Sequence, residues 1–204
     1  MEYAFLGNAA SGVTLRLDYR AFAYAGKFVV SDTGKAVLRT ADGSPAVPEW
    51  TPDRSLPSTV DPTAFAADVV AAVSFSPDRT DPDCCRLRYV TVHVARRGEG
   101  LGPQLIARTL AALADEGFSV CRIAVNNPFA YAACYDCGFV YTGDQTGIAE
   151  LELVRSLDET SPASTATDDH YHKGLRAFHN ADHELTVAEQ RFIHGRLDAR
   201  DPTA

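Results

Sequence analysis

The sequence predicts an α/β fold in which helices flank a central mixed β-sheet, followed by a helical appendage at the C-terminal end. The first indication is an apolar strand at 85–94 that leads through a glycine-rich turn into a helix at 103–116. The second is the apolar run at 120–125, which predicts a strand returning parallel to the first. The third is the apolar spacing at 186–197, which is typical of an amphipathic helix.

The N-terminal third is predicted to contain strands separated by irregular segments. Apolar and polar residues alternate at 14–18, and residues 27–39 predict a hairpin that turns at 32–34. Residues 43–63 contain five prolines and the single tryptophan of the chain, so they predict a long irregular loop. A further strand is expected at 66–76.

The segment after the strand at 120–125 continues the alternation of strands and helices. Asn127 as a helix cap and Pro128 in the first turn predict a short helix that runs to Gly138. Two more strands, at 139–142 and 148–154, are expected to complete the sheet.

We expect residues 1–155 to form the main domain, followed by a linker at 156–169 and a helical extension at 170–204. The linker is small, polar and poor in apolar residues. Thr186 and Glu189 have the spacing of a capping box at the start of a helix. An extension of this size buries too little surface to fold alone, so it should pack on the main domain or on a second copy of the chain in a homodimer.

Composition and charge exclude several classes of function. The 204 residues include 27 acidic and 19 basic side chains, and the formal net charge of −8 argues against non-specific nucleic-acid binding. The chain has no run of about 18 apolar residues and no signal-like start, so we expect no membrane span and a cytoplasmic location. The acidic, lysine-poor composition resembles that of halophilic proteins, although GC-rich codon bias produces a similar one.

The cysteines and histidines of the chain do not predict a metal site. Five cysteines, two of them adjacent, do not form a secreted disulfide framework, which favours a reducing cytoplasm. Cys134 and Cys137 have the spacing of half a metal or redox motif, but no second pair accompanies them, so we expect core positions. His179 and His183 have helical spacing and are expected to lie on a polar helix face.

The most informative segment is the glycine turn, residues 97–102, between the predicted strand and helix. Arg97, Gly100 and Gly102 have the spacing Arg-x-x-Gly-x-Gly. Such a turn directs backbone N–H groups and the positive end of the helix dipole toward one point, which suits the phosphates of a cofactor. Gly98 does not complete the Gly-x-Gly-x-x-Gly fingerprint of dinucleotide-binding domains, so that alternative is disfavoured.

This order of elements resembles the GNAT superfamily of acyl-CoA-dependent N-acyltransferases. The glycine turn is followed, at the family's spacing, by an Asn…Ala…Gly-Phe block. The resemblance covers residues 85–154. It does not extend to residues 19–65, where the family has its first two helices and usually builds substrate selection. The matching residues are Val92, Arg97, Gly100, Gly102, Val125, Asn127, Ala130, Gly138 and Phe139.

The resemblance implies an N-acetyltransferase that uses acetyl-CoA. A primary amine of a small molecule or protein would attack the acyl carbonyl directly, without a covalent enzyme intermediate. The glycine turn would bind the pyrophosphate, and the strand backbone would bind the pantetheine where this strand splays from the one at 120–125. The implied cofactor-binding residues are Val92, Val94, Arg97, Gly98, Glu99, Gly100, Leu101, Gly102, Asn127 and Tyr135.

The groups that would transfer protons depart from the family pattern. Many members have a tyrosine four residues before the glycine of the Gly-Phe pair, but Cys134 occupies that position. Tyr131 lies one turn earlier on the same helix face. The group that protonates the departing thiolate is therefore Tyr131, Cys134 or water. The alternative for Cys134 is that it is a small residue of the core. His93 is the candidate base because of its ordinary pKa, although strand alternation favours a surface position.

These departures leave a second function open, that of a CoA-binding regulatory or scaffolding module without turnover. The strand at 85–94 carries no carboxylate, although some relatives use a Glu there as the base. Glu99 is expected to be solvated. Arg86 and Arg88 share a strand face and are expected to pair with acidic residues rather than with an acidic substrate.

Overall fold

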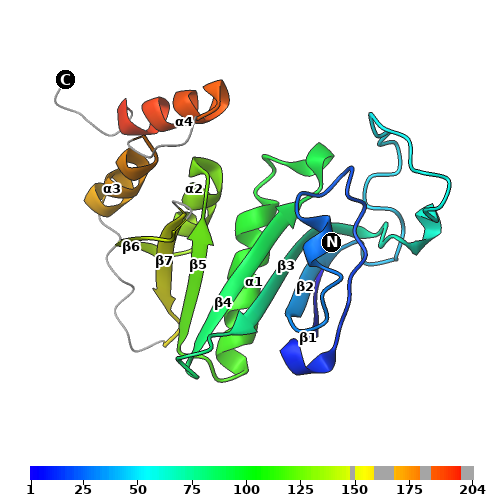
Figure 1. Ribbon diagram of the computed structural model, residues 1–204, viewed down its shortest axis with the longest axis horizontal. Helices are drawn as coiled ribbons and strands as arrows, with labels where there is room; N and C mark the ends of the chain where they lie inside the picture. Colours follow the sequence, from blue (N-terminus) through cyan, green and yellow to red (C-terminus); the bar gives the residue numbers. More distant parts are fainter. Residues whose placement is uncertain (148–149, 159–167, 180–184, 199–204) are drawn as a thin grey trace. The chain divides into compact units, whose positions relative to one another are not determined.

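The computed structural model of the protein describes residues 1–147, 150–158, 168–179 and 185–198 (Figure 1). These residues form seven β-strands and four α-helices, which confirms the predicted α/β class. The chain divides into two compact units, residues 1–117 and 118–204. Within the described ranges, no helix is both long and apolar enough to cross a membrane.

In the first unit, four strands form an antiparallel sheet on which one helix packs. The helix α1 contacts all four strands, and its apolar residues at helical spacing are buried. Residues 69–75 of the third strand are buried without interruption, so both of its faces are covered. In order across the sheet the strands are β1 (Glu2–Gly7), β2 (Gly34–Arg39), β3 (Val69–Pro77) and β4 (Cys84–Val92), and α1 spans Leu101–Asp115.

The segment between β1 and β2 differs from the prediction. The strand expected at 14–18 does not form, and only the second arm of the hairpin expected at 27–39 is a strand, which is β2. The segment makes turns instead and places Leu15, Leu17 and Phe28 in a buried hydrophobic cluster.

Lys35 explains this difference, because its side chain is fully buried. Its ammonium group donates hydrogen bonds to the backbone oxygens of Val13 at 2.6 Å, Val30 at 2.7 Å and Thr33 at 2.8 Å. A buried charge requires such acceptors, and alternation of side chains along the chain does not reveal this requirement. The segment therefore folds around the ammonium group and does not continue the sheet.

The loop predicted at 43–63 is irregular, as expected, and ends in one short 3-10 turn, Pro62–Ala64. It is anchored to the rest of the unit at several points. The N–H of Ala46 donates to the oxygen of Ala67 at 2.8 Å, and the Arg20 guanidinium donates to the oxygen of Arg54 at 3.1 Å. Trp50 packs half-buried against the hydrophobic cluster.

The second unit contains a three-stranded antiparallel sheet and three helices. Strands β5 and β6 both pair with β7. The predicted strand at 120–125 and the predicted short helix are confirmed, the helix with its N-cap: the Asn127 side chain accepts from the N–H of Ala130 at 2.9 Å. The elements are β5 (Val120–Val125), α2 (Pro128–Asp136), β6 (Val140–Gln145), β7 (Leu151–Ser156), α3 (Asp168–His179) and α4 (Val187–Asp198).

Both helices of the predicted extension contact α2, so the extension packs within this unit. The capping box at its second helix forms, with the Thr186 N–H donating to Glu189 at 2.8 Å and the Glu189 N–H donating to the Thr186 hydroxyl at 3.3 Å. Most of the predicted linker at 156–169 lies outside the described residues, as does His183.

Replacement of Lys35 by methionine should lower the free energy of unfolding by about 2 kcal/mol or more, because three backbone carbonyl oxygens lose the buried ammonium group as their donor. Urea unfolding monitored by the fluorescence of Trp50, the single tryptophan, measures this change. Lys27→Met removes an exposed lysine and is the control, with an expected effect within about 0.5 kcal/mol. Equal stabilities of the two variants would contradict the role given to Lys35.

Candidate functional site

The glycine turn lies between β4 and α1, as the sequence predicts. A short 3-10 turn, Val94–Arg96, follows the strand, and Gly98 and Gly100 then adopt positive φ values of 85° and 74°. A Cβ atom placed on either glycine would meet no other atom within 4 Å. The space that a side chain would occupy is therefore open at both positions, and the positive φ values favour glycine there.

The start of α1 presents backbone donors at this turn. Gly100 is the N-cap, and the first helical hydrogen bond runs from the N–H of Gln104 to the Gly100 oxygen at 3.1 Å. The N–H groups of Leu101 and Gly102 precede that bond and have no acceptor within the helix. They lie at the positive end of the helix dipole, an arrangement that binds phosphate groups.

Two arginines beside the turn have different partners. Arg96 forms an ion pair with Glu99 at 2.7 Å, and this contact lowers the pKa of the Glu99 carboxyl. Glu99 is therefore exposed, as expected, but it is paired rather than only solvated. Arg97 is exposed and donates to the backbone oxygen of Val92 at 3.4 Å, and no carboxylate among the described residues pairs with it. Arg97 is thus the guanidinium group of the turn that is available to an anion.

The backbone at the end of β4 is already hydrogen-bonded to other parts of the first unit. The N–H of Val94 donates to the oxygen of Ala21 at 2.9 Å, so this N–H reaches a ligand only if that bond opens. The side chain of Val92 lies 3.9 Å from the position that a Cβ atom on Gly102 would occupy. A Cβ atom at position 102 would therefore make an ordinary van der Waals contact with Val92.

The surface position that alternation favoured for His93 is wrong, because the side chain is only 6% exposed. Its Nδ1 accepts a hydrogen bond from the N–H of Ala95 at 3.2 Å, and its ring packs edge-on against Phe22 and Trp50. Burial lowers the pKa of His93. Because Nδ1 is the acceptor, the neutral ring carries its proton on Nε2, and its basic nitrogen is already occupied.

The imidazole of His93 should titrate below the ordinary value of about 6.5, as the Nε2–H tautomer. The ring should stay neutral as the pH falls through the range in which an exposed histidine becomes charged. Nitrogen-15 NMR of the imidazole measures both the tautomer and the pKa, and the His93→Gln variant assigns the signal. A His93 pKa at or above 6.5, or an Nδ1–H tautomer, would contradict this arrangement.

The candidates in the second unit lie on or next to α2. Asn127 uses its side-chain oxygen for the helix cap and donates from its amide nitrogen to Asn126 at 3.1 Å. Tyr131 is fully buried, and its hydroxyl group donates to the backbone oxygens of His170 at 3.1 Å and Tyr171 at 3.2 Å in α3. Burial raises the pKa of Tyr131.

Cys134 is only 1% exposed, and burial together with the neighbouring Cys137 raises the pKa of its thiol. All five cysteines are buried, as expected for core residues. Tyr135 is half-buried with its ring centroid 4.6 Å from that of Tyr171. As the structure stands, the hydroxyl of Tyr131 and the thiol of Cys134 are enclosed by protein.

Helix α3 approaches Tyr131 closely because residue 174 is glycine, and a Cβ atom there would overlap the phenol ring and its oxygen. Gly174→Ala should therefore lower the melting temperature, although alanine is ordinarily the better helix former by about 1 kcal/mol. Gly195→Ala in α4 is the matched control, because its Cβ would meet nothing within 4 Å, and this variant should be at least as stable as the wild type. An equal rise in melting temperature in both variants would show that α3 does not pack closely on Tyr131.

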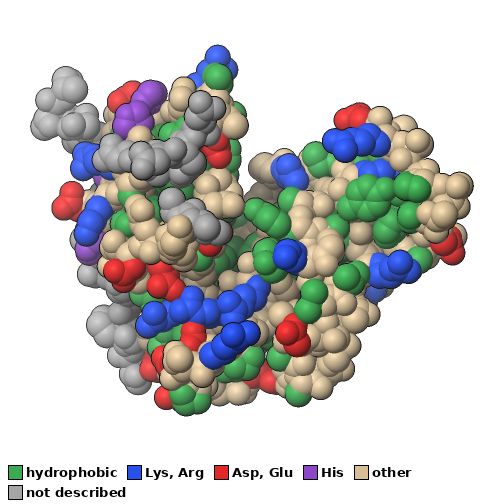
Figure 2. Space-filling model, viewed as in Figure 1, with side chains coloured by type: hydrophobic (Ala, Val, Ile, Leu, Met, Phe, Trp, Pro, Cys, Tyr) green, Lys and Arg blue, Asp and Glu red, His purple; other side chains and the backbone are tan. Residues whose placement is uncertain are grey.

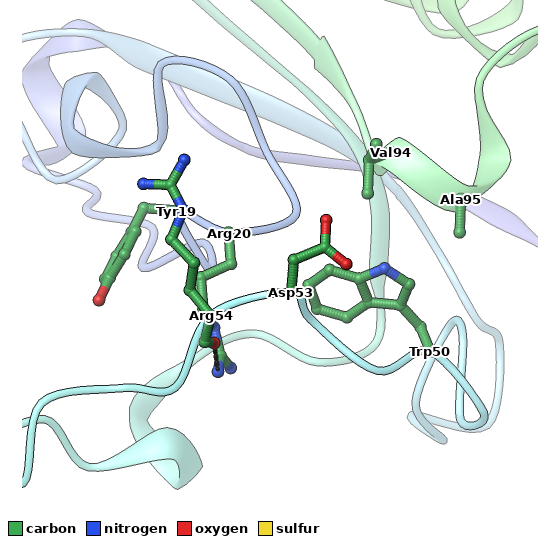
Figure 3. Close-up of a pocket in the computed structure, with 7 residues that line it drawn as sticks. All are labelled: Tyr19, Arg20, Trp50, Asp53, Arg54, Val94 and Ala95. Atoms are coloured by element: carbon green, nitrogen blue, oxygen red, sulfur yellow. Dashed lines mark hydrogen bonds between the residues drawn. The ribbon is translucent and has the colours of Figure 1, made fainter.

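Beside the turn, the first unit contains a cavity of about 350 Å³ that the sequence did not predict (Figure 3). Two of its lining residues, Val94 and Ala95, immediately precede the glycine turn. The other lining residues come from the segment between β1 and β2 and from the proline-rich loop, and they are Tyr19, Arg20, Trp50, Asp53 and Arg54. Figure 2 shows basic and hydrophobic side chains next to one another over these loops. A proline-rich loop with the single tryptophan was the only sign of this cavity in the sequence.

Of the two arginines of β4, Arg86 pairs with an acidic residue as expected, and Arg88, among the described residues, does not. Arg86 forms an ion pair with Asp78, and this contact holds the pKa of the Asp78 carboxyl well below its usual range. Arg88 donates to the Ser76 hydroxyl at 2.8 Å. In the part of the chain that the structure describes, no three His, Cys, Asp or Glu side chains are grouped so that they could hold a metal ion.

Several solved structures are similar to the chain at low sequence identity. An N-acetyltransferase from Staphylococcus aureus is 13% identical, with 62% of this chain and 68% of that chain covered and a TM-score of 0.44. A GCN5-related N-acetyltransferase from Kribbella flavida is 18% identical, with 61% and 67% covered and a TM-score of 0.44. PaiA N-acetyltransferase from Thermoplasma acidophilum, in complex with coenzyme A, is 13% identical, with 44% and 55% covered and a TM-score of 0.38.

A search of curated proteins finds no match to the sequence. The sequence pattern that defines the acetyltransferase (GNAT) family matches residues 39–139. This segment runs from the last residue of β2 to the residue before β6 and includes both the glycine turn and α2. From β3 through α2, the chain therefore has the sequence pattern of the acetyltransferase (GNAT) family.

Proposed function

We propose that the chain is an N-acyltransferase that moves an acetyl group from acetyl-CoA to a primary amine of a small molecule or protein. The observation that carries this proposal is the glycine turn, where two positive-φ glycines lead into the start of α1 and the N–H groups of Leu101 and Gly102 have no acceptor within the helix. The match of residues 39–139 to the acetyltransferase family supports the same activity.

The residues of the turn fit the diphosphate of CoA. The N–H groups of Gly100, Leu101 and Gly102 would donate to its oxygens, and the unpaired guanidinium of Arg97 would balance its charge. Gly98 and Glu99 would complete the turn, with Glu99 held aside by Arg96. The strand backbone of Val92 would bind the pantetheine, and that of Val94 would do so once its N–H leaves the oxygen of Ala21. Asn127 and Tyr135 are kept as cofactor-binding residues on the family resemblance alone.

Acetyl-CoA supplies an activated acyl carbonyl. In the reaction, a bond forms from the neutral amine nitrogen to the carbonyl carbon, and the bond from that carbon to sulfur breaks. The amine nitrogen loses a proton, and the thiolate of CoA takes one up. The occupied Nδ1 of His93 opposes a role as the base, and the burial of Tyr131 and Cys134 supports water as the proton donor.

The second candidate is a CoA-binding regulatory or scaffolding module without turnover. The enclosed hydroxyl of Tyr131 and thiol of Cys134 favour it, because neither side chain is available to a ligand as the structure stands. Release of free CoA thiol in the presence of amines separates the two candidates, since the module would bind acetyl-CoA without consuming it.

Gly100→Glu should weaken acetyl-CoA binding about tenfold or more, because it places a carboxylate where the phosphates would bind. Calorimetric titration with acetyl-CoA measures the affinity. Gly43→Glu is the control, since Gly43 has a φ of 73° with open space around it but lies in the proline-rich loop. The two variants carry similar backbone strain and the same charge, so only the place of the substitution differs.

An unchanged affinity of the Gly100→Glu protein for acetyl-CoA would overturn the assignment of the glycine turn. Circular dichroism of both variants checks that each remains folded. A wild-type protein that is folded but does not bind acetyl-CoA would overturn the proposed function as a whole.

A further inference from the structure

The cavity beside the glycine turn contains one pair of opposite charges that the protein itself leaves unpartnered. Among the described residues, neither the Asp53 carboxylate nor the Arg54 guanidinium has a hydrogen-bond or ion-pair partner, although both line the cavity. Figure 3 shows the carboxylate of Asp53 on the side toward Val94 and the guanidinium of Arg54 on the other side, toward Tyr19. The cavity therefore offers an anionic and a cationic group that are separated from each other.

The second arginine of the cavity has a different role, because its charge is already balanced. The Arg20 guanidinium donates to both carboxylate oxygens of Asp18, with its closest contact at 2.6 Å. It also donates to the backbone oxygen of Arg54 at 3.1 Å. Arg20 therefore holds the loop in place and leaves Arg54 as the cation available to a ligand.

Apolar surface lies close to these charges. Trp50 lines the cavity and packs edge-on against the buried ring of His93 at 4.8 Å between ring centroids. Val94 and Tyr19, which also line it, are 42% and 52% exposed. A volume of about 350 Å³ falls in the range of small-molecule sites, which is about 300–1,000 Å³.

We propose that this cavity binds the acyl acceptor, and that the acceptor is a zwitterionic amine of the amino-acid type with an apolar side chain. The carboxylate of the acceptor pairs with Arg54 and its side chain lies against Trp50. Its amino group binds beside Asp53 as the ammonium ion and loses a proton to water before the neutral amine attacks. This inference rests on the proposed function, because it places the acceptor next to Val94, whose backbone is proposed to bind the pantetheine that carries the acetyl group.

Other classes of acceptor fit these groups less well. A polyamine would leave the guanidinium of Arg54 facing a second cation. A simple alkylamine would pair with Asp53 but leave Arg54 without an anion. A carboxylic acid without an amine would leave Asp53 unpaired. A zwitterion pairs both charges at once, and the gain from each charged hydrogen bond is the basis of the expected preference.

The test uses leucine and two analogues that each lack one charge, isoamylamine without the carboxylate and isocaproate without the amine. Because Trp50 is the only tryptophan of the chain and lines the cavity, its fluorescence reports occupancy without any turnover. Leucine should bind about tenfold more tightly than either analogue. In the presence of acetyl-CoA, leucine should also have a kcat/KM about tenfold above that of isoamylamine.

Two variants assign the preference to the unpartnered pair. Arg54→Gln should lower the affinity for leucine about tenfold and leave that for isoamylamine unchanged, so that the preference disappears. Asp53→Asn should weaken the binding of leucine and the binding of isoamylamine by similar factors. Arg79→Gln removes an exposed arginine from outside the cavity and should leave the preference as it is in the wild type.

The outcomes separate this inference from the proposed function. Acetyl transfer to leucine and isoamylamine with equal kcat/KM, or an equal loss for both in Arg54→Gln, would overturn the zwitterion assignment and leave the acyltransferase standing. Preferential leucine binding in a protein that does not bind acetyl-CoA would support the cavity assignment and overturn the proposed activity.

Discussion

A buried ammonium group organises the segment between β1 and β2, which supplies part of the cavity wall. Lys35 extends from β2 into the protein and donates to three backbone oxygens between β1 and β2, with distances of 2.6 to 2.8 Å. A charge at this depth is tolerated only when it is surrounded by acceptors, so the chain around it has little freedom to rearrange. The loop conformation follows from this requirement more than from intrinsic strand or helix preference.

The segment between β1 and β2 contacts the walls of the cavity directly. The oxygen of Ala21 accepts the N–H of Val94, which ties the loop to the end of β4. Arg20, paired with Asp18, holds the backbone of Arg54 and therefore the proline-rich loop. These contacts link the cavity to the start of α1, where the glycine turn leaves its donors unused. The end of β4 and the backbone of Arg54 are thus both held by hydrogen bonds to the segment between β1 and β2.

The second unit shows how packing can change the chemistry that a residue type suggests. Tyr131 and Cys134 were candidates because a phenol or thiol on the short helix can donate a proton. In the structure α3 covers Tyr131, and Gly174 permits an approach that any larger residue would prevent. His93 changes in the same way, since burial between two aromatic rings and a bond to Ala95 occupy its basic nitrogen. Burial and hydrogen-bond partners are tertiary properties, and the residue types alone do not contain them.

The local elements could be predicted from the sequence alone, because they depend on short-range rules. Apolar spacing predicted α1 and β5, Asn127 predicted the start of α2, and the spacing from Arg97 to Gly102 predicted a turn with free N–H groups. Only the tertiary structure decided where the segment before β2 goes, which side chains are enclosed, and that Asp53 and Arg54 meet Val94 at one cavity. The physical reason is range: caps and glycine φ values act over a few residues, whereas a buried charge and a cavity wall depend on groups that are distant in the chain.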